Sequence, residues 1–287
     1  MKKIAIIQDL SSLGKCSLTA AIPVISVMGL QPCPLPTAVL SNQTGFPSFY
    51  LDDYTDRMER IMEEWKKRNF IPDGIYTGFL AGERQADIIL KFLEEFARDH
   101  TWILIDPVMG DKGSAFGFYT DALCEKMRVL AEKAHVITPN LTEAILLLKG
   151  KDSLEETWDH LSKAEEREYL SQIESLGKAL CQRFSLRAAV ITGIDLKKEG
   201  EPSRIGNLVW EQEKPFWSFS QKYGGSYSGT GDMFASVLCG GLVKGMSMEA
   251  SVKKAVSFLS GAIRDTVREG TDRNEGIAFE PHLWELV

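Results

Sequence analysis

The chain has 287 residues, of which 44% are hydrophobic and 25% are charged, which is typical of a packed globular protein and excludes a disordered or low-complexity one. Its net charge of −7 argues against a nucleic-acid-binding surface, and no apolar run approaches the roughly 20 residues that span a bilayer. The five cysteines are scattered without disulfide or zinc-site spacing, which favours the reducing cytoplasm as the location.

Short apolar runs alternate with segments of helical period along the chain. The predicted strands cover residues 4–8, 33–40, 74–77, 102–106, 136–138 and 189–192, with amphipathic helices between and after them. This alternation predicts a three-layer α/β/α sandwich with a mainly parallel central sheet and helices on both faces. Because no linker or composition break divides the chain, residues 1–287 are expected to form one domain. The highly charged residues 151–167 are expected to form one exposed surface helix.

Ligands of an open parallel sheet bind beyond the carboxyl ends of its strands, so the motifs found there carry most information. One is Gly229-Thr230-Gly231-Asp232, which directly precedes a run of helical period. Glycines and a helix N-terminus together point backbone N–H groups at an anion, and Asp232 could accept a proton there. The alternative is that Asp232 only caps the helix.

Two further motifs follow predicted strands. In Asp106-Pro107-Val108-Met109-Gly110-Asp111, two carboxylates lie on one strand-end loop, an arrangement that suits Mg²⁺. In Thr138-Pro139-Asn140-Leu141-Thr142-Glu143, Asn140 and Glu143 would share a face of a first helical turn. The alternatives are ordinary loop punctuation for the first motif and a helix cap for the second.

These motifs occur together with Ser41-Asn42-Gln43-Thr44-Gly45-Phe46 and Thr77-Gly78-Phe79. In this order they resemble the pyridoxal kinases of the ribokinase-like superfamily over nearly the whole chain. The resemblance implies ATP-dependent phosphorylation of the 5′-hydroxymethyl group of a vitamin B6 vitamer. It implies that Asp232 is the base and that the amides of Gly229, Thr230 and Gly231 bind the transferring phosphoryl group.

The same resemblance implies the cofactors and their residues. Asp111 and Glu143 would serve Mg²⁺–ATP, and Asp106, Thr138 and Thr192 match positions near a monovalent cation such as K⁺. The residues implied to bind the nucleotide are Asn140, Thr192, Gly193, Tyr223, Gly224, Gly225 and Thr230. The residues implied to contact the pyridine ring are Asp9, Cys16, Thr44 and Phe79.

The chain departs from the family pattern on the substrate side. Asp9 stands where the family usually has Ser, Phe79 stands where Tyr is usual, and residues 15–18 replace a glycine-asparagine ending. Asp9 favours an alternative within the superfamily, a hydroxymethylpyrimidine kinase of thiamine synthesis, whereas residues 41–46 favour a vitamin B6 kinase. A non-catalytic protein that binds B6 vitamers is a third possibility. The family resemblance also suggests a cytoplasmic homodimer, with small molecules rather than nucleic acids or membranes as partners.

Overall fold

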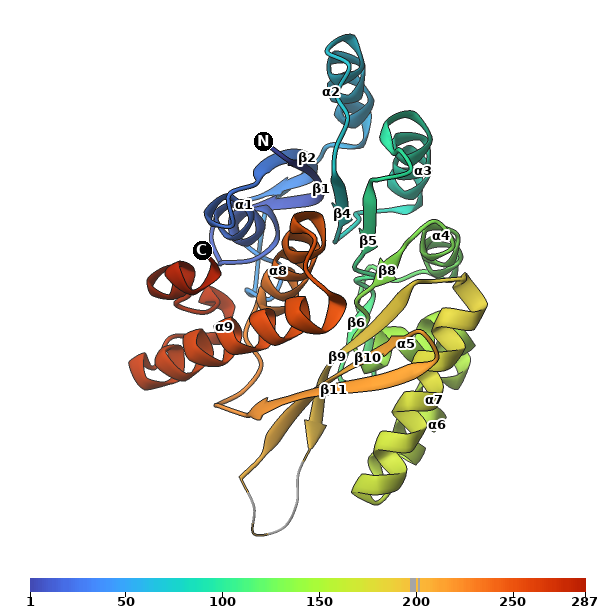
Figure 1. The fold of residues 1–287 in the computed structure, drawn as a ribbon, viewed down its shortest axis with the longest axis vertical. Coiled ribbons are helices and arrows are strands. Elements are labelled where there is room, and N and C mark those ends of the chain that lie inside the picture. The colour runs from blue at the N-terminus through green and yellow to red at the C-terminus, as the bar shows by residue number, and fades with distance from the viewer. Residues whose placement is uncertain (197–199, 201) are drawn as a thin grey trace. The chain divides into compact units, whose positions relative to one another are not determined.

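The computed structural model describes residues 1–196, 200 and 202–287, and these divide into two compact units. The first unit combines Met1–Trp102 with Tyr223–Val287, and the second is Ile103–Lys222. Each unit is described by itself below, with the labels of Figure 1. The expectation of one domain over residues 1–287 stays a prediction.

The first unit is a mainly parallel sheet with helices packed on it. In the strand order β4-β1-β2-β3, the pairs β1–β4 and β1–β2 are parallel and β2–β3 is antiparallel. Residues 4–7 of the central strand are fully buried, as expected for a strand covered on both faces. The elements are β1 (Lys3–Ser11), α1 (Ser17–Val27), β2 (Gln31–Leu40), β3 (Leu51–Asp53), α2 (Thr55–Lys67), β4 (Gly74–Thr77), α3 (Glu83–Phe96), α8 (Thr230–Lys244), α9 (Met248–Glu269) and the short 3₁₀ helices η2 (Arg273–Glu275) and η3 (Glu280–Leu286).

The second unit has the same type of architecture with a different edge. The strands β5, β8 and β9 pair in parallel, and β10 and β11 then add an antiparallel hairpin. A separate small hairpin, β6–β7, follows β5. The elements are β5 (Trp102–Ile105), β6 (Gly110–Asp111), β7 (Ser114–Ala115), α4 (Asp121–Ala131), β8 (Val136–Ile137), α5 (Leu141–Lys149), η1 (Lys151–Ser153), α6 (Leu154–Ser162), α7 (Glu166–Phe184), β9 (Ala188–Leu196), β10 (Arg204–Glu211) and β11 (Lys214–Gln221).

The predicted fold class is confirmed, because both units consist of mainly parallel strands flanked by helices (Figure 1). All six predicted strands are present, with bounds that differ by a few residues. The hairpin β10–β11 was not predicted. Its two-residue turn, Gln212-Glu213, has positive φ at both positions but lacks the Asn-Gly or Asp-Gly pair that normally signals such a turn.

The prediction of one exposed helix over residues 151–167 is wrong. The segment forms η1, α6 and the start of α7, because the chain leaves the helical conformation between Ser162 and Glu166 and is extended at Glu165. It is also not wholly on the surface. Leu154 and Leu161 of α6 are buried, so the apolar residues at helical spacing form a packed face under the charged one.

Candidate functional site

In the first unit, the Gly229-Thr230-Gly231-Asp232 motif forms the start of α8. Gly229 is the N-cap at a φ of +80°, and the first turn leaves backbone N–H groups without acceptors in the helix. A Cβ atom at Gly229 would lie 1.9 Å from the carbonyl oxygen of Lys15, so only glycine fits there. A Cβ atom at Gly231 would meet no atom within 4 Å, so the space in front of this turn is open. The turn can therefore accept an anion.

The Asp232 side chain does not cap its own helix, so that alternative is wrong. Its Oδ2 accepts a hydrogen bond from the backbone N–H of Ser17 at 2.8 Å. Its Oδ1 accepts one from the Tyr76 hydroxyl, with 3.4 Å between the oxygens. The carboxylate is therefore held by the first residue of α1 and by a strand residue of β4, at the mouth of the turn.

The pKa of Asp232 is raised to about 7. Burial is the largest cause, and the negative charge of Asp9 adds to it, whereas the bonds from Ser17 and Tyr76 act in the opposite direction. A carboxyl group that titrates near neutral pH can take up a proton from a hydroxyl group and release it again, which is what a general base has to do.

Asp9 and Cys16 lie in the same neighbourhood. Asp9 is inside β1 rather than after it, because the strand continues to Ser11 through a shift of its register against β2. Its carboxylate is buried and accepts the Ser11 hydroxyl at 2.8 Å, and burial raises its pKa. Burial, followed by the charges of Asp232 and Asp9, raises the pKa of the Cys16 thiol to about 12.

Of the four residues predicted to contact a pyridine ring, the structure brings Asp9 and Cys16 together with Asp232. Thr44 is exposed in a turn, and Phe79 is half-buried beyond the end of β4, where its carbonyl oxygen accepts the Thr37 hydroxyl at 3.1 Å. The role of Thr44 and Phe79 in binding the ring stays a prediction.

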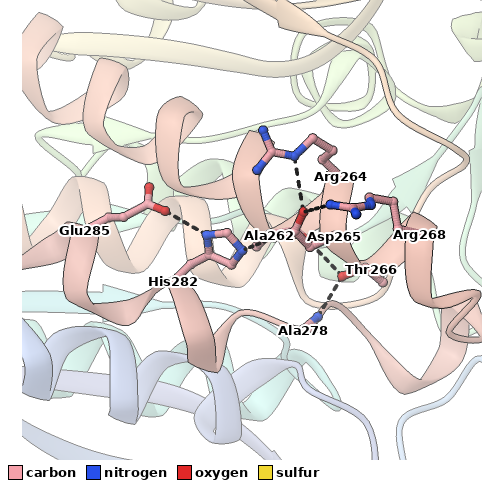
Figure 2. Close-up of polar contacts among 8 residues, drawn as sticks. All are labelled: Ala262, Arg264, Asp265, Thr266, Arg268, Ala278, His282 and Glu285. Atoms are coloured by element: carbon pink, nitrogen blue, oxygen red, sulfur yellow. Dashed lines mark hydrogen bonds and ion pairs between the residues drawn. The ribbon is translucent and has the colours of Figure 1, made fainter.

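The C-terminal segment supports the loop that precedes α1. The Lys15 amide donates to the carbonyl oxygen of Glu275, and its Nζ lies 2.8 Å from Glu280 Oε2. This segment is itself tied to α9 by His282, whose Nδ1 lies 2.7 Å from Glu285 Oε1 and whose Nε2 lies 3.1 Å from Asp265 Oδ2 (Figure 2). The end of the chain thereby holds the loop against which Gly229 packs.

In the second unit, two buried carboxyl groups follow the strands β5 and β8. Asp106 directly follows β5 and accepts the hydroxyl of Thr138, the residue after β8, at 2.9 Å. Burial raises the pKa of Glu143 well above its usual range, and the charge of Asp106 raises it further. Two nearby buried carboxyl groups repel each other unless a proton or a cation lies with them.

The helix-cap interpretation of Asn140 and Glu143 is correct, and it explains how Glu143 is held. Asn140 Oδ1 accepts the Glu143 N–H at 3.0 Å, and Glu143 Oε2 accepts the Asn140 N–H at 2.9 Å, which together form a capping box at the start of α5. Glu143 Oε1 also accepts the Met109 N–H at 3.1 Å. Backbone groups from two loops thus fix the orientation of this carboxylate.

Asp111 lies at the end of β6, half-buried, and its Oδ1 accepts the neighbouring Lys112 N–H at 2.9 Å. The turn that follows is held by α5 and α6. Gly113 N–H donates to the Thr142 hydroxyl at 2.8 Å, and a Cβ atom at Gly113 would lie 2.8 Å from the Trp158 ring. The charged segment 151–167 therefore packs beside the Asp111 hairpin through Trp158.

The remaining residues predicted to bind the nucleotide lie in both units. In the second, Thr192 N–H donates to Pro139 O at 2.9 Å, and Gly193, at a φ of +69°, donates its N–H to Asn207 Oδ1 at 3.1 Å. This places Thr192 beside the loop that carries Thr138 and Asn140. In the first unit, the Tyr223–Gly225 segment precedes α8, with Gly224 at a φ of +56°.

The residues of the second unit fit a magnesium–nucleotide complex. Within residues 1–196, 200 and 202–287, no group of three His, Cys, Asp or Glu side chains has a metal-binding arrangement. Mg²⁺ does not need one, since it is commonly held by one or two carboxylates with the remaining positions taken by phosphate oxygens and water. The buried pair of Asp106 and Glu143 has the oxygen chemistry and the excess negative charge that such a cation neutralises.

Sequence reasoning missed the donors around Asp232. Tyr76 lies in a short apolar strand, where it reads as a core residue, and Ser17 contributes only its backbone N–H. A polar hydroxyl at the end of a buried strand was the only available signal for Tyr76.

Among the described residues, no helix is long and apolar enough to cross a membrane.

Comparisons with known proteins show the family to which the chain belongs. The family model described as phosphomethylpyrimidine kinase matches residues 20–276. A structure from Bacteroides thetaiotaomicron, described as a phosphomethylpyrimidine kinase with pyridoxal, is 36% identical, covers 99% of this chain and 95% of its own, and has a TM-score of 0.88.

Two further relatives are named as pyridoxal-type kinases. The pyridoxine/pyridoxal/pyridoxamine kinase of Bordetella avium is 25% identical over 259 residues, which are 88% of this chain and 81% of that protein. The structure of Leishmania donovani pyridoxal kinase in complex with ADP and pyridoxine is 20% identical, covers 99% of this chain and 95% of its own with a TM-score of 0.79, and shows a shared fold. The predicted relationship to the pyridoxal kinases is confirmed, and the chain belongs to the phosphomethylpyrimidine kinase family.

Proposed function

We propose that this protein is a kinase that uses ATP to phosphorylate the 5′-hydroxymethyl group of a vitamin B6 vitamer. The observation that carries the proposal is Asp232: a carboxylate with a pKa near 7, beside a helix N-terminus that is open to an anion. A relative at 36% identity was crystallised with pyridoxal, and a neighbour of the same fold holds ADP and pyridoxine. Both support a vitamin B6 vitamer and ATP as the ligands.

The geometry of each unit supports the proposed roles, which the family resemblance implies. Asp232 accepts the proton of the substrate hydroxyl, which makes the oxygen nucleophilic as it attacks phosphorus. The N–H groups of Gly229, Thr230 and Gly231 stabilise the charge of the phosphoryl group in transfer. When bound, Mg²⁺–ATP supplies that phosphoryl group and the positive charge that balances its oxygens.

On the nucleotide side, we propose that Glu143 and Asp111 hold Mg²⁺ directly or through water. Asn140, Thr192, Gly193 and the Tyr223–Gly225 segment contact the nucleotide in this proposal. A monovalent cation near Asp106, Thr138 and Thr192, a homodimer and a cytoplasmic location are parts of the proposal that rest on the family resemblance alone.

A hydroxymethylpyrimidine kinase is the second candidate, and two observations favour it. The matching family model is described as phosphomethylpyrimidine kinase, which names a related pyrimidine as substrate. Asp9 places a carboxylate close to Asp232, where it could bind the amino group of a pyrimidine. The two activities share the base and the anion-binding turn, so they differ in which substrate ring the first unit accepts.

The test is an assay of ADP release with pyridoxal, pyridoxine, pyridoxamine and hydroxymethylpyrimidine, each over a range of concentrations. Higher kcat/KM for any B6 vitamer than for the pyrimidine supports the proposal, and the reverse order supports the second candidate. Tight binding of a vitamer without ADP release would identify a binding protein and overturn both.

A further inference from the structure

The Asp232 carboxylate receives one hydrogen bond on each oxygen, and the two donors differ in kind. The Ser17 donor is a backbone N–H at 2.8 Å from Oδ2. The Tyr76 donor is a side-chain hydroxyl at 3.4 Å from Oδ1. Only the second can be removed or strengthened without altering the main chain. Tyr76 therefore offers a direct way to alter the surroundings of Asp232 while its helix stays intact.

Packing alone does not explain the hydroxyl of Tyr76. The side chain is fully buried in β4, between Ile75 and Thr77. Gly74 of the same strand packs against α8, where a Cβ atom would lie 2.6 Å from Val243 Cγ2. A phenylalanine would fill the same volume in this apolar layer without a hydroxyl that needs a partner. The hydroxyl of Tyr76 reaches the carboxylate that we propose as the base.

The electrostatic surroundings of Asp232 indicate what the Tyr76 hydroxyl does. Asp232 faces the carboxylate of Asp9 from β1 and the thiol of Cys16 from the start of α1, together with the Ser17 N–H and the Tyr76 hydroxyl. Burial and the Asp9 charge favour the protonated form of Asp232, which cannot act as a base. A hydroxyl that donates to Oδ1 stabilises the ionised form and restricts rotation of the carboxylate.

We propose that Tyr76 is a positioning residue for the reaction: through its hydroxyl it orients the Asp232 carboxylate and keeps it ionised between Asp9 and Cys16. This inference rests on the proposed function, in which Asp232 is the base. The oxygen–oxygen distance of 3.4 Å is long for a hydroxyl–carboxylate bond, and catalytic hydrogen bonds of this kind tighten when substrate is bound.

The experiment compares the pH dependence of kcat and kcat/KM in the wild-type protein and in Tyr76→Phe. A hydrogen bond to a charged group is worth roughly a tenfold effect or more, so kcat at pH 7 should fall about tenfold. The acidic limb of the pH–rate profile should move to higher pH by about one unit, because the ionised Asp232 has lost a hydrogen-bond donor. The KM for ATP should not change.

The matched control is Tyr169→Phe, which removes a half-buried hydroxyl from α7 in the second unit, and it should leave the profile unmoved. Replacement of Tyr76 by 3-fluorotyrosine keeps the ring and makes the hydroxyl a stronger donor, so it should move the limb to lower pH. This variant keeps the test decisive if Tyr76→Phe does not fold. A ¹³C NMR titration of the Asp232 carboxyl carbon in the protein without substrate should show the same shifts independently of turnover.

The outcomes separate this inference from the proposed function. If Asp232→Asn abolishes turnover while the Tyr76 variants leave both the limb and the NMR titration unmoved, the role of Tyr76 is overturned and the base assignment stands. If Asp232→Asn retains normal kcat, the base assignment fails and the role of Tyr76 fails with it. Opposite shifts in Tyr76→Phe and the fluorotyrosine variant support the proposal.

Discussion

The two units hold their buried carboxylates in different ways. In the first, Asp232 is surrounded by groups that can gain or lose a proton: the Asp9 carboxyl, the Cys16 thiol and the Tyr76 hydroxyl. In the second, Glu143 is held by backbone N–H groups of Asn140 and Met109, which cannot titrate, and its main charged neighbour is Asp106. The same functional group is therefore suited to the proton transfer that we propose for one unit and to the cation that we propose for the other.

This difference follows from local chain geometry. Asp232 lies in the first turn of α8, but its side chain turns away from its own helix and is held by side-chain and backbone groups from α1 and β4. Glu143 lies in the first turn of α5 and completes a capping box with its own helix. A carboxylate that caps its helix is fixed in place, whereas one released from that role is available to a substrate.

The sharpest test of the contrast is Asp232→Asn. The asparagine oxygen can still accept the Ser17 N–H, so the fold should be kept while the proton acceptor is lost. We expect kcat to fall by a factor on the order of 10²–10⁴, with little change in ATP binding. The measurements are steady-state kinetics and calorimetric titration with an ATP analogue. A kcat near the wild-type value would show that Asp232 only supports the start of α1.

The two glycines of the anion-binding turn form a matched pair for the second test. In Gly231→Ala the new methyl group enters open space, so stability should hardly change, but a phosphoryl group displaced by about 1 Å should lower kcat about 10²-fold. In Gly229→Ala the methyl group meets Lys15 O at positive φ, so unfolding free energy should fall by about 3 kcal/mol or more. Urea unfolding and kcat measure both effects. Normal kcat in folded Gly231→Ala would contradict the anion-binding role.

For the second unit, Asp111→Asn should raise the Mg²⁺ concentration needed for half-maximal activity by about 10–100-fold. The reason is that the substitution removes the negative charge of a half-buried carboxylate. Only one oxygen of that carboxylate, Oδ1, accepts the Lys112 N–H. The control is Asp195→Asn, which removes an exposed carboxylate that pairs with Lys222 in the same unit. Asp232→Asn should leave the Mg²⁺ dependence as it is. If Asp111→Asn and Asp195→Asn respond alike, the division of tasks between the units is wrong.

The smallest expected effect concerns substrate choice. Asp9→Ser removes a buried carboxylate beside Asp232, so a substrate held by a charge-assisted contact should lose about tenfold in kcat/KM relative to the others. The loss should fall on pyridoxamine or hydroxymethylpyrimidine if Asp9 binds an amino group, and on substrates protonated at the ring nitrogen if it binds that atom. The acidic limb of the pH–rate profile should also move to lower pH, which is opposite to the shift expected for Tyr76→Phe. Equal changes in kcat/KM for pyridoxal, pyridoxamine and hydroxymethylpyrimidine would mean that Asp9 does not select among them.

The sequence was most informative where local rules decide the structure. Apolar runs located every predicted strand, and the Asn140–Glu143 spacing indicated a shared helical turn, which the capping box confirms. Local rules were insufficient where a partner comes from a distant segment. The Tyr76–Asp232 contact joins residues 156 positions apart, and the turn of the β10–β11 hairpin carries Gln212 and Glu213 in a conformation that their side chains do not signal. Such features depend on tertiary packing.

The first unit draws its residues from both ends of the chain, and this affects how the protein is made. During synthesis, residues 1–102 leave the ribosome long before α8 exists to pack on β4 or to deliver Asp232. The contacts of Asn274 with Gln43 and of Glu280 with Lys15 form later still. Contacts of such high sequence separation are slow to form. The apolar surface of residues 1–102 therefore stays exposed to solvent until those contacts are made. Removing the last few residues of the chain should therefore lower the yield of folded protein more than it lowers the activity of the molecules that do fold.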